Sequence, residues 1–382
     1  MARIIYALSG QGRGHASRVM AMSRCLRDRG HEIIYCCGGT AETILEERGE
    51  YVLPVPSLRQ VLKANQICVA ETFRLNAKTV LNAPRIIKML SRTFERLDPD
   101  LLITDFEAFA PRAAESVGIP VLSFNHQQVV TEARYKLPLS DIPSALMAST
   151  VIQCIAPSDP AHVLLTSFYF PNLKDPTRAS YVPPIIRQDV QDLSAVEGDH
   201  ILVYYNQPAQ AKEVLNTLRG VDAKFVLYNF GDGRDIPTSP NLIFKQPSID
   251  GFLEDLRTSR AVICTAGFTL SSEALYLGKP LLVVPNRGIF EQTLNAHFLK
   301  RENLGHAVID RPLEKSDITS FIDRLDTFRA RLHGYEPCGN RQAADVIDSL
   351  LSTPAEAPHQ NGRHTHPRTT PIPTTDPVPS VQ

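Results

Sequence analysis

Short apolar runs alternate along the chain with longer segments whose apolar residues recur at helical spacing. Residues 3–8 predict a strand, the segment after them predicts an amphipathic helix closed by Gly30, and residues 32–37 predict the next strand. The same unit recurs between residues 100 and 125. Because parallel strands need a crossover between them, this rhythm predicts an α/β domain built on a parallel sheet.

A second copy of this rhythm follows a stretch that is rich in proline and polar residues. Strands are expected at residues 200–205, 224–228, 242–245, 261–264 and 280–285, and helices at 250–259, 270–277 and 292–301. The pattern predicts two facing Rossmann-like, doubly wound α/β domains. The expected divisions are an N-terminal domain at 1–170, a linker at 171–198, a C-terminal domain at 199–335, a final helix at 336–352 and a disordered Pro/Thr-rich tail at 353–382.

Composition and charge exclude several classes of protein. The 382 residues carry 40 Lys and Arg against 41 Asp and Glu, so no nucleic-acid partner is expected. The seven cysteines contain no C-x-x-C pair, which argues against a disulfide framework or a zinc cluster. No apolar stretch reaches the ~20 residues of a membrane helix, and the N-terminus lacks a signal-peptide core. We therefore expect a cytoplasmic protein.

The first predicted strand leads into a glycine loop, G-Q-G-R-G-H, that ends in His15. This loop lacks the third glycine and the acidic end of the second strand that a dinucleotide-binding fingerprint requires. Gly12 and Gly14 still let the backbone approach a ligand, and a histidine at the mouth of a helix can act as a base near neutral pH. The alternative interpretation is a loop that only turns the chain.

The most informative segment is the strand-to-helix junction at residues 265–269, T-A-G-F-T. Free backbone N–H groups and the positive end of the helix dipole favour a diphosphate at such a place. Further polar side chains follow at Glu273 and at the start of a later helix, Glu291-Gln292 and Asn295. Each also has an ordinary interpretation, with Thr269 as an N-cap, Glu273 as a solvated residue and Glu291 as a partner of the helix dipole.

The succession A-G-F-T, Glu, G-K-P, V-P and E-Q-x-x-N-A resembles the donor half of nucleotide-sugar glycosyltransferases with the two-domain GT-B fold. It is most similar to the MurG-like transferases and the related bacterial and archaeal family often labelled teichoic acid biosynthesis protein. The resemblance implies a donor site for diphosphate, ribose and sugar, made of Gly267, Phe268, Thr269, Glu273, Glu291, Gln292 and Asn295.

The first half resembles the acceptor domain of the same family through the run P-D-L-L-I-T-D, which ends in Asp105. The resemblance implies an aspartate that orients the catalytic histidine, so Asp105 is the candidate partner of His15. Acceptor contacts are expected at Gly12, Gly14 and His126; His126 is an alternative base or a satisfied loop histidine. Arg187, in P-P-I-I-R, resembles an inter-domain arginine near the donor phosphates. The alternative for Asp105 is a helix cap.

These residues together predict an inverting, metal-independent hexosyltransferase. His15 takes a proton from an acceptor hydroxyl, and the donor is a nucleotide-diphosphate sugar, expected to be a UDP-sugar, that serves as substrate without any cofactor. The acceptor is expected to be a glycan or a lipid-linked molecule of the cell envelope. Two alternatives stay open: a nucleotide-sugar 2-epimerase on the same fold, and a non-catalytic nucleotide-sugar or glycan-binding protein. The altered loop Tyr205-Asn206-Gln207 favours the second alternative.

Residues 84–97 predict a basic amphipathic helix. Its basic residues recur at helical spacing, and its apolar residues lie on another face. Such a helix either packs one face on a core or lies on an anionic membrane. The residues that would make a peripheral contact with the inner membrane face are Arg85, Lys88, Arg92 and Arg96.

Overall fold

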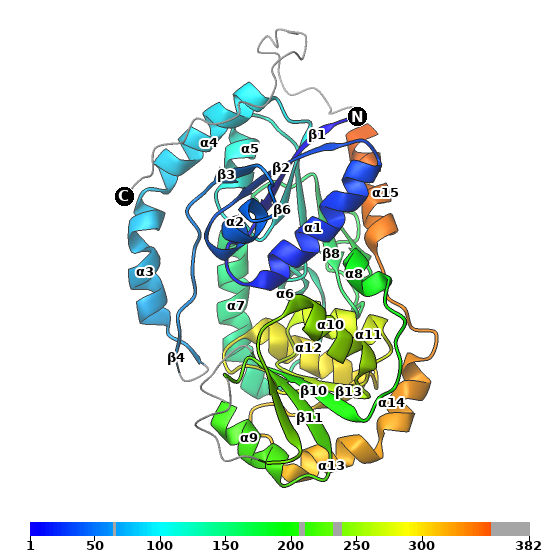
Figure 1. Cartoon of the computed structure of the whole chain (residues 1–382). Helices are drawn as coiled ribbons and strands as arrows, with labels where there is room; N and C mark the ends of the chain where they lie inside the picture. The colour runs from blue at the N-terminus through cyan, green and yellow to red at the C-terminus, as the bar shows by residue number, and fades with distance from the viewer. Residues whose placement is uncertain (64–65, 206–210, 232–238, 353–382) are drawn as a thin grey trace.

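The computed structural model describes residues 1–63, 66–205, 211–231 and 239–352 (Figure 1). Within these residues, the first half forms a sheet in which all neighbouring strands are parallel. Its strands in spatial order are β3 (Val52–Pro54), β2 (Glu32–Cys37), β1 (Arg3–Leu8), β6 (Leu101–Asp105), β7 (Val121–Asn125), β8 (His162–Thr166) and β9 (Ala179–Val182). The order reverses between β1 and β6, and open α/β sheets bind ligands at the carboxyl ends of the strands beside such a point.

The second half repeats this architecture. Its parallel strands in spatial order are β12 (Leu242–Lys245), β11 (Lys224–Tyr228), β10 (His200–Tyr204), β13 (Ala261–Cys264), β14 (Leu281–Val283) and β15 (Gly305–Ala307). The order reverses between β10 and β13, so this sheet has a corresponding edge for ligands. The prediction of two Rossmann-like, doubly wound domains is therefore confirmed.

Helices connect these strands. They are α1 (Arg13–Asp28), α2 (Gly39–Glu46), α3 (Val69–Leu81), α4 (Ala83–Leu97), α5 (Ala110–Ser116), α6 (Val129–Glu132), α7 (Ile142–Ile155), α8 (Gln188–Gln191), α9 (Ala211–Arg219), α10 (Ile249–Thr258), α11 (Phe268–Tyr276), α12 (Phe290–Arg301), α13 (Lys315–Asp323), α14 (Leu325–Leu332) and α15 (Asn340–Ser352). Successive side chains of a strand face opposite sides of its sheet. Ile4 and Tyr6 accordingly pack with α1 and α15, whereas Ile5 and Ala7 pack with α4 and α5.

The predicted final helix, α15, follows the second sheet in sequence but packs on the first half (Figure 1). Ala343, Ala344 and Ile347 are buried in the same core as α1. Arg29, just after α1, donates hydrogen bonds to Asp345 at 2.7 Å and Asp348 at 2.5 Å. The chain therefore crosses between the two sheets a second time, and this crossing ties the halves together.

Three further expectations concern membrane-spanning helices, the basic helix α4 and two segments that lie outside the described residues. Among the described helices, none is both long and apolar enough to cross a membrane. In α4 the apolar face is buried at Ile86, Leu90 and Phe94, and the four basic residues are exposed. Membrane contact through them stays a prediction. The tail at 353–382 and Asn206–Gln207 lie outside the described residues.

Candidate active site

The glycine loop and strand β6 bring His15 and Asp105 together. Gly12 adopts φ 81° as the N-cap of α1, a conformation that favours glycine, and the helix then starts at Arg13. Asp105 is the last residue of β6. His15 Nδ1 lies 3.1 Å from Asp105 Oδ1, and the two side chains are 16% and 0% exposed. His15 Nε2 has no hydrogen-bond partner among the described residues, so it is the ring nitrogen that can receive a proton.

A third residue, Arg18, completes this group and was missed in the sequence. It lies one helical turn after His15 and is 5% exposed. Its Nε and Nη2 donate hydrogen bonds to both oxygens of Asp105, at 2.7 to 3.1 Å. Burial alone would raise the pKa of Asp105, but the charge of Arg18 and the hydrogen bonds from His15 and Arg18 outweigh it and hold that pKa below its usual value. Asp105 is therefore an ionised, acceptor-only group. The i, i+3 spacing of His15 and Arg18 was the available signal.

Just after each of strands β6 and β13, a non-glycine residue has a left-handed backbone conformation. Phe106 follows Asp105 with φ 62°, and Ala266 follows β13 by two residues with φ 60°. Such conformations are costly for residues with a side chain and gather at functional sites. The Ala266 carbonyl accepts a hydrogen bond of 3.0 Å from Asn295 Nδ2, which helps to hold that turn.

The predicted diphosphate loop faces the glycine loop of the other half. Gly267 is the N-cap of α11, so the interpretation of Thr269 as the N-cap is wrong. A Cβ added at Gly267 would meet nothing within 4 Å, which leaves the start of this helix open. Thr269 Oγ1 donates a long hydrogen bond of 3.5 Å to the Gly14 carbonyl. The two loops predicted separately therefore lie against each other.

Glu273 and Arg187 form an ion pair. Arg187 Nε and Nη2 donate to Glu273 Oε1 and Oε2 at 2.8 and 2.9 Å. Glu273 is 3% exposed; burial raises its pKa, and the charge of Arg187 opposes this rise. The predicted ribose ligand and the predicted phosphate ligand are thus adjacent, and each holds the other. Their roles toward a donor stay predictions.

The three predicted residues of helix α12 have different partners and exposure. Gln292 Oε1 accepts a hydrogen bond of 2.9 Å from the Asn286 backbone N–H. Asn295 is 1% exposed, and its Oδ1 accepts a hydrogen bond of 2.7 Å from the Tyr169 hydroxyl. Glu291 is partly exposed, and its charge acts on Arg18. Of the three, Glu291 is therefore the one free to meet a ligand beside the His15 group.

His126 is a buried structural residue in this arrangement. It is 1% exposed, and its ring lies 3.8 Å from that of Phe268 in a stacked geometry. Its Nδ1 lies 2.8 Å from the Thr166 carbonyl oxygen, and its Nε2 lies 2.8 Å from Asn295 Oδ1. Burial lowers its pKa. A neutral ring has a single N–H, so only one of these two oxygens accepts a hydrogen bond from it. In this arrangement the buried ring is closed to an acceptor, and a role for His126 as acceptor contact or alternative base stays a prediction.

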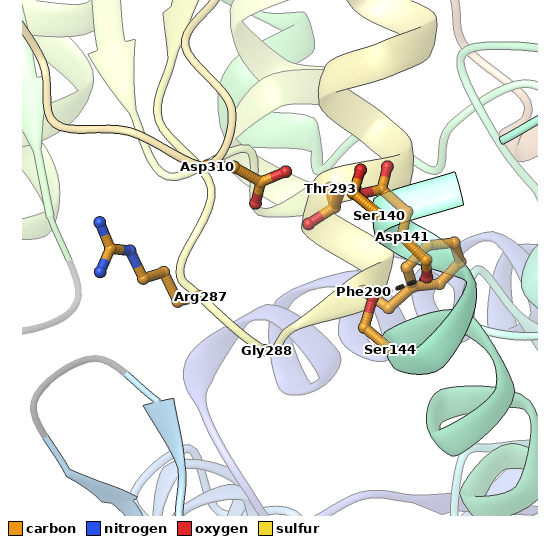
Figure 2. A pocket seen from close by; sticks show the side chains of 8 residues that line it. All are labelled: Ser140, Asp141, Ser144, Arg287, Gly288, Phe290, Thr293 and Asp310. Carbon is orange, nitrogen blue, oxygen red and sulfur yellow. Dashed lines mark hydrogen bonds between the residues drawn. The ribbon is translucent and has the colours of Figure 1, made fainter. Parts of the chain in front are cut away.

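A cavity of about 400 Å³ adjoins this region between α7 and the start of α12. Figure 2 shows Arg287 pointing away from the side chains that gather around Thr293. The lining residues are Ser140, Asp141, Ser144, Arg287, Gly288, Phe290, Thr293 and Asp310, and none of them was predicted as a site residue. Throughout the described ranges, no group of three or more His, Cys, Asp or Glu could hold a metal ion.

Comparisons with known proteins show which family the chain is similar to. The model of a family described as glycosyl transferase family 1 matches residues 2–326. An uncharacterized glycosyltransferase of Methanosarcina acetivorans is 25% identical, with 79% of this chain and 84% of the relative covered. One of Methanosarcina mazei is 24% identical with the same coverage.

Solved structures show the same fold. The glycotransferase of kitacinnamycin superposes with a TM-score of 0.66 at 17% identity, covering 92% of this chain and 99% of that one. MurG of Acinetobacter baumannii superposes with a TM-score of 0.63 at 15% identity, covering 91% and 100%. At these identities the likeness concerns the fold alone.

Proposed function

The chain belongs to glycosyl transferase family 1 and is a glycosyltransferase of the GT-B type, and on that premise we propose an inverting, metal-independent hexosyltransferase. It moves a sugar from a nucleotide-diphosphate donor, a UDP-sugar, to a hydroxyl of a glycan or lipid-linked acceptor. The observation that carries this proposal is the contact of His15 Nδ1 with Asp105, which leaves Nε2 without a partner among the described residues.

The proposed reaction follows from this geometry. Because ionised Asp105 can only accept, His15 donates from Nδ1 and keeps a lone pair on Nε2. Nε2 removes the proton of the acceptor hydroxyl, whose oxygen forms a bond to the anomeric carbon of the donor sugar. The bond between that carbon and the diphosphate oxygen breaks, and its electron pair leaves with the nucleotide diphosphate. Backbone N–H groups at Gly267 to Thr269 stabilise this leaving charge.

Nucleotide binding is the first test, by thermal shift with UDP, GDP, TDP and their sugars. A ligand at ~100 times its dissociation constant adds ~2.7 kcal/mol to the free energy of unfolding. Gly267→Ala adds a Cβ at the open start of α11, where the diphosphate is proposed to bind. This variant should therefore abolish the thermal shift. Gly220→Ala, whose Cβ would make only an ordinary contact of 3.6 Å, should keep it and is the control.

Product analysis with and without acceptors then tests the reaction. Transfer to an acceptor hydroxyl with inverted anomeric configuration is the expected result. Conversion of the donor alone would support a 2-epimerase, and binding without any turnover would support a non-catalytic protein. No shift with any nucleotide would contradict the donor site itself.

A further inference from the structure

Arg18 occupies a position that a simple histidine–aspartate pair does not need. We propose that Arg18 is a positioning residue that sets the protonation of His15. Its charge neutralises that of Asp105, so Asp105 orients the imidazole ring without stabilising the protonated form of His15. This inference rests on the proposed function, because it concerns the base of that reaction. It assigns a role to a residue whose sequence context is that of an ordinary helix arginine.

The hydrogen bonds divide Asp105 between its two neighbours. Asp105 Oδ1 lies 2.7 Å from Arg18 Nη2 and 3.1 Å from His15 Nδ1, whereas Oδ2 is held by Arg18 alone. Arg18 can only donate and the ionised carboxylate can only accept. The bond to Oδ1 needs the proton of His15 on Nδ1 and favours the tautomer with a basic Nε2. The contact of Nδ1 with Arg18 Nη2, which would need a lone pair on Nδ1, is longer at 3.3 Å.

The charges explain why this arrangement matters. Asp105 and Arg18 are 0% and 4% exposed at their side chains, and together they are electrically neutral. A proton on His15 then adds a net positive charge 3.3 Å from Arg18 Nη2. An unpaired carboxylate in the same place would stabilise the imidazolium and raise its pKa. Arg18 compensates the charge of Asp105, so no unpaired carboxylate disfavours the neutral imidazole that a general base needs.

Other groups around the pair do not replace this effect. Tyr6 on β1 faces Asp105 and Arg18, and burial holds its pKa well above the usual value, so it is neutral. Glu291 on α12 acts on Arg18 from the second half and is partly exposed. Arg13, on the same helix as His15, is exposed and screened by water.

The second half also fixes the position of the guanidinium. The Arg18 guanidinium carbon lies 5.6 Å from the centroid of the Phe268 ring, which belongs to the predicted diphosphate loop. A cation over an aromatic face is attracted to it. Arg18 is thus held from both sides of the site.

The test is a titration of His15 by NMR in the full-length chain with labelled histidine, the signal being assigned with His15→Gln. Arg18→Gln should raise the pKa of His15 by about one unit or more, because the carboxylate is then unpaired. Asp105→Asn should lower it. The double variant removes both charges of the buried pair and should return the His15 pKa close to the wild-type value.

One further variant and the double variant keep the test conclusive if Arg18→Gln does not fold. Arg18→Lys retains the charge but not the paired contacts with both oxygens of Asp105, so the His15 pKa should lie closer to the wild-type value than in Arg18→Gln. If Arg18→Gln does not fold, the pKa of the double variant and of Arg18→Lys still test the charge relation. Equal His15 pKa values in all folded variants, Asp105→Asn included, overturn the proposal, since Arg18 would then be structural only.

The titration is independent of turnover. If no donor or acceptor supports transfer, the proposed function fails while the His15 pKa values still test the charge relation. In an active enzyme, the acidic limb of kcat/KM against pH should move upward by the same amount in Arg18→Gln, and activity should return at higher pH. A purely structural defect lowers activity equally at every pH.

Discussion

The two sides of the site differ in what their polar side chains hold. On the first side, Arg18, Asp105 and His15 form hydrogen bonds with one another, and His15 Nε2 has no partner among the described residues. On the second side, Glu273 is held by Arg187 and Gln292 by a backbone N–H. Polar groups fixed in advance toward the reacting atoms favour catalysis, whereas groups that hold one another must be released before they bind a ligand.

Because of this difference, substitutions on the two sides should affect different properties of the protein. Changes on the first side should lower the rate with little effect on nucleotide binding. Changes on the second side should lower stability, and they should affect nucleotide binding mainly through the backbone of the loop at Gly267 to Thr269.

His15→Gln should have the largest effect, because it removes the proposed base and leaves the donor loop intact. We expect kcat to fall by about 10²- to 10⁴-fold, the usual contribution of a general base. The thermal shift with the nucleotide should stay unchanged. His31→Gln is the matched control, since His31 also pairs with an aspartate, Asp348, at 2.8 Å but lies under α15. A kcat within threefold of wild type for His15→Gln would contradict the base assignment.

Arg187→Met should have the second-largest effect, which is a loss of stability. It leaves the buried carboxylate of Glu273 without its charged partner, which typically costs about 3 kcal/mol. Arg27→Met is the control, because Arg27 pairs with Glu50 in the same two-bond geometry at an exposed site, where such pairs contribute about 0 to 1 kcal/mol. Urea unfolding of both variants measures the difference.

The pH dependence of Arg187→Met sharpens this test. Burial raises the pKa of Glu273 above its unfolded value, and removal of Arg187 takes away the charge that opposes this rise. The folded variant therefore binds more protons than the unfolded chain once pH exceeds the ordinary glutamate pKa, so its stability falls as pH rises from there. The deficit should be smaller at pH 5 than at pH 8. A deficit that does not change with pH would mean that Glu273 is not the cause.

The fold was largely predictable from the sequence. Apolar strand runs and glycine-ended helices are local signals, and the rule that ligands bind at the carboxyl ends of parallel strands placed His15 and Asp105 at one edge. The unpredicted features depend on distant contacts. Arg18 lies 87 positions from Asp105, and the burial of His126 comes from Phe268, which belongs to the other half. The i, i+3 spacing places Arg18 on the helix face of His15, but no local pattern reports its contact with Asp105 or the packing of Phe268 on His126.

Disturbing the contact between Gly14 and Thr269, which joins the two sides, should have the smallest effect. A Cβ at Gly14 would come within 2.9 Å of Thr269 Oγ1, so Gly14→Ala forces that hydroxyl to move. We expect KM for the donor to rise several-fold, a loss of about 1 kcal/mol. In Thr269→Ala the hydroxyl is absent and the added Cβ would meet only the Cβ of residue 269, at 3.6 Å. Gly14→Ala should therefore have no further effect in Thr269→Ala, and additive effects would show that the loops act independently.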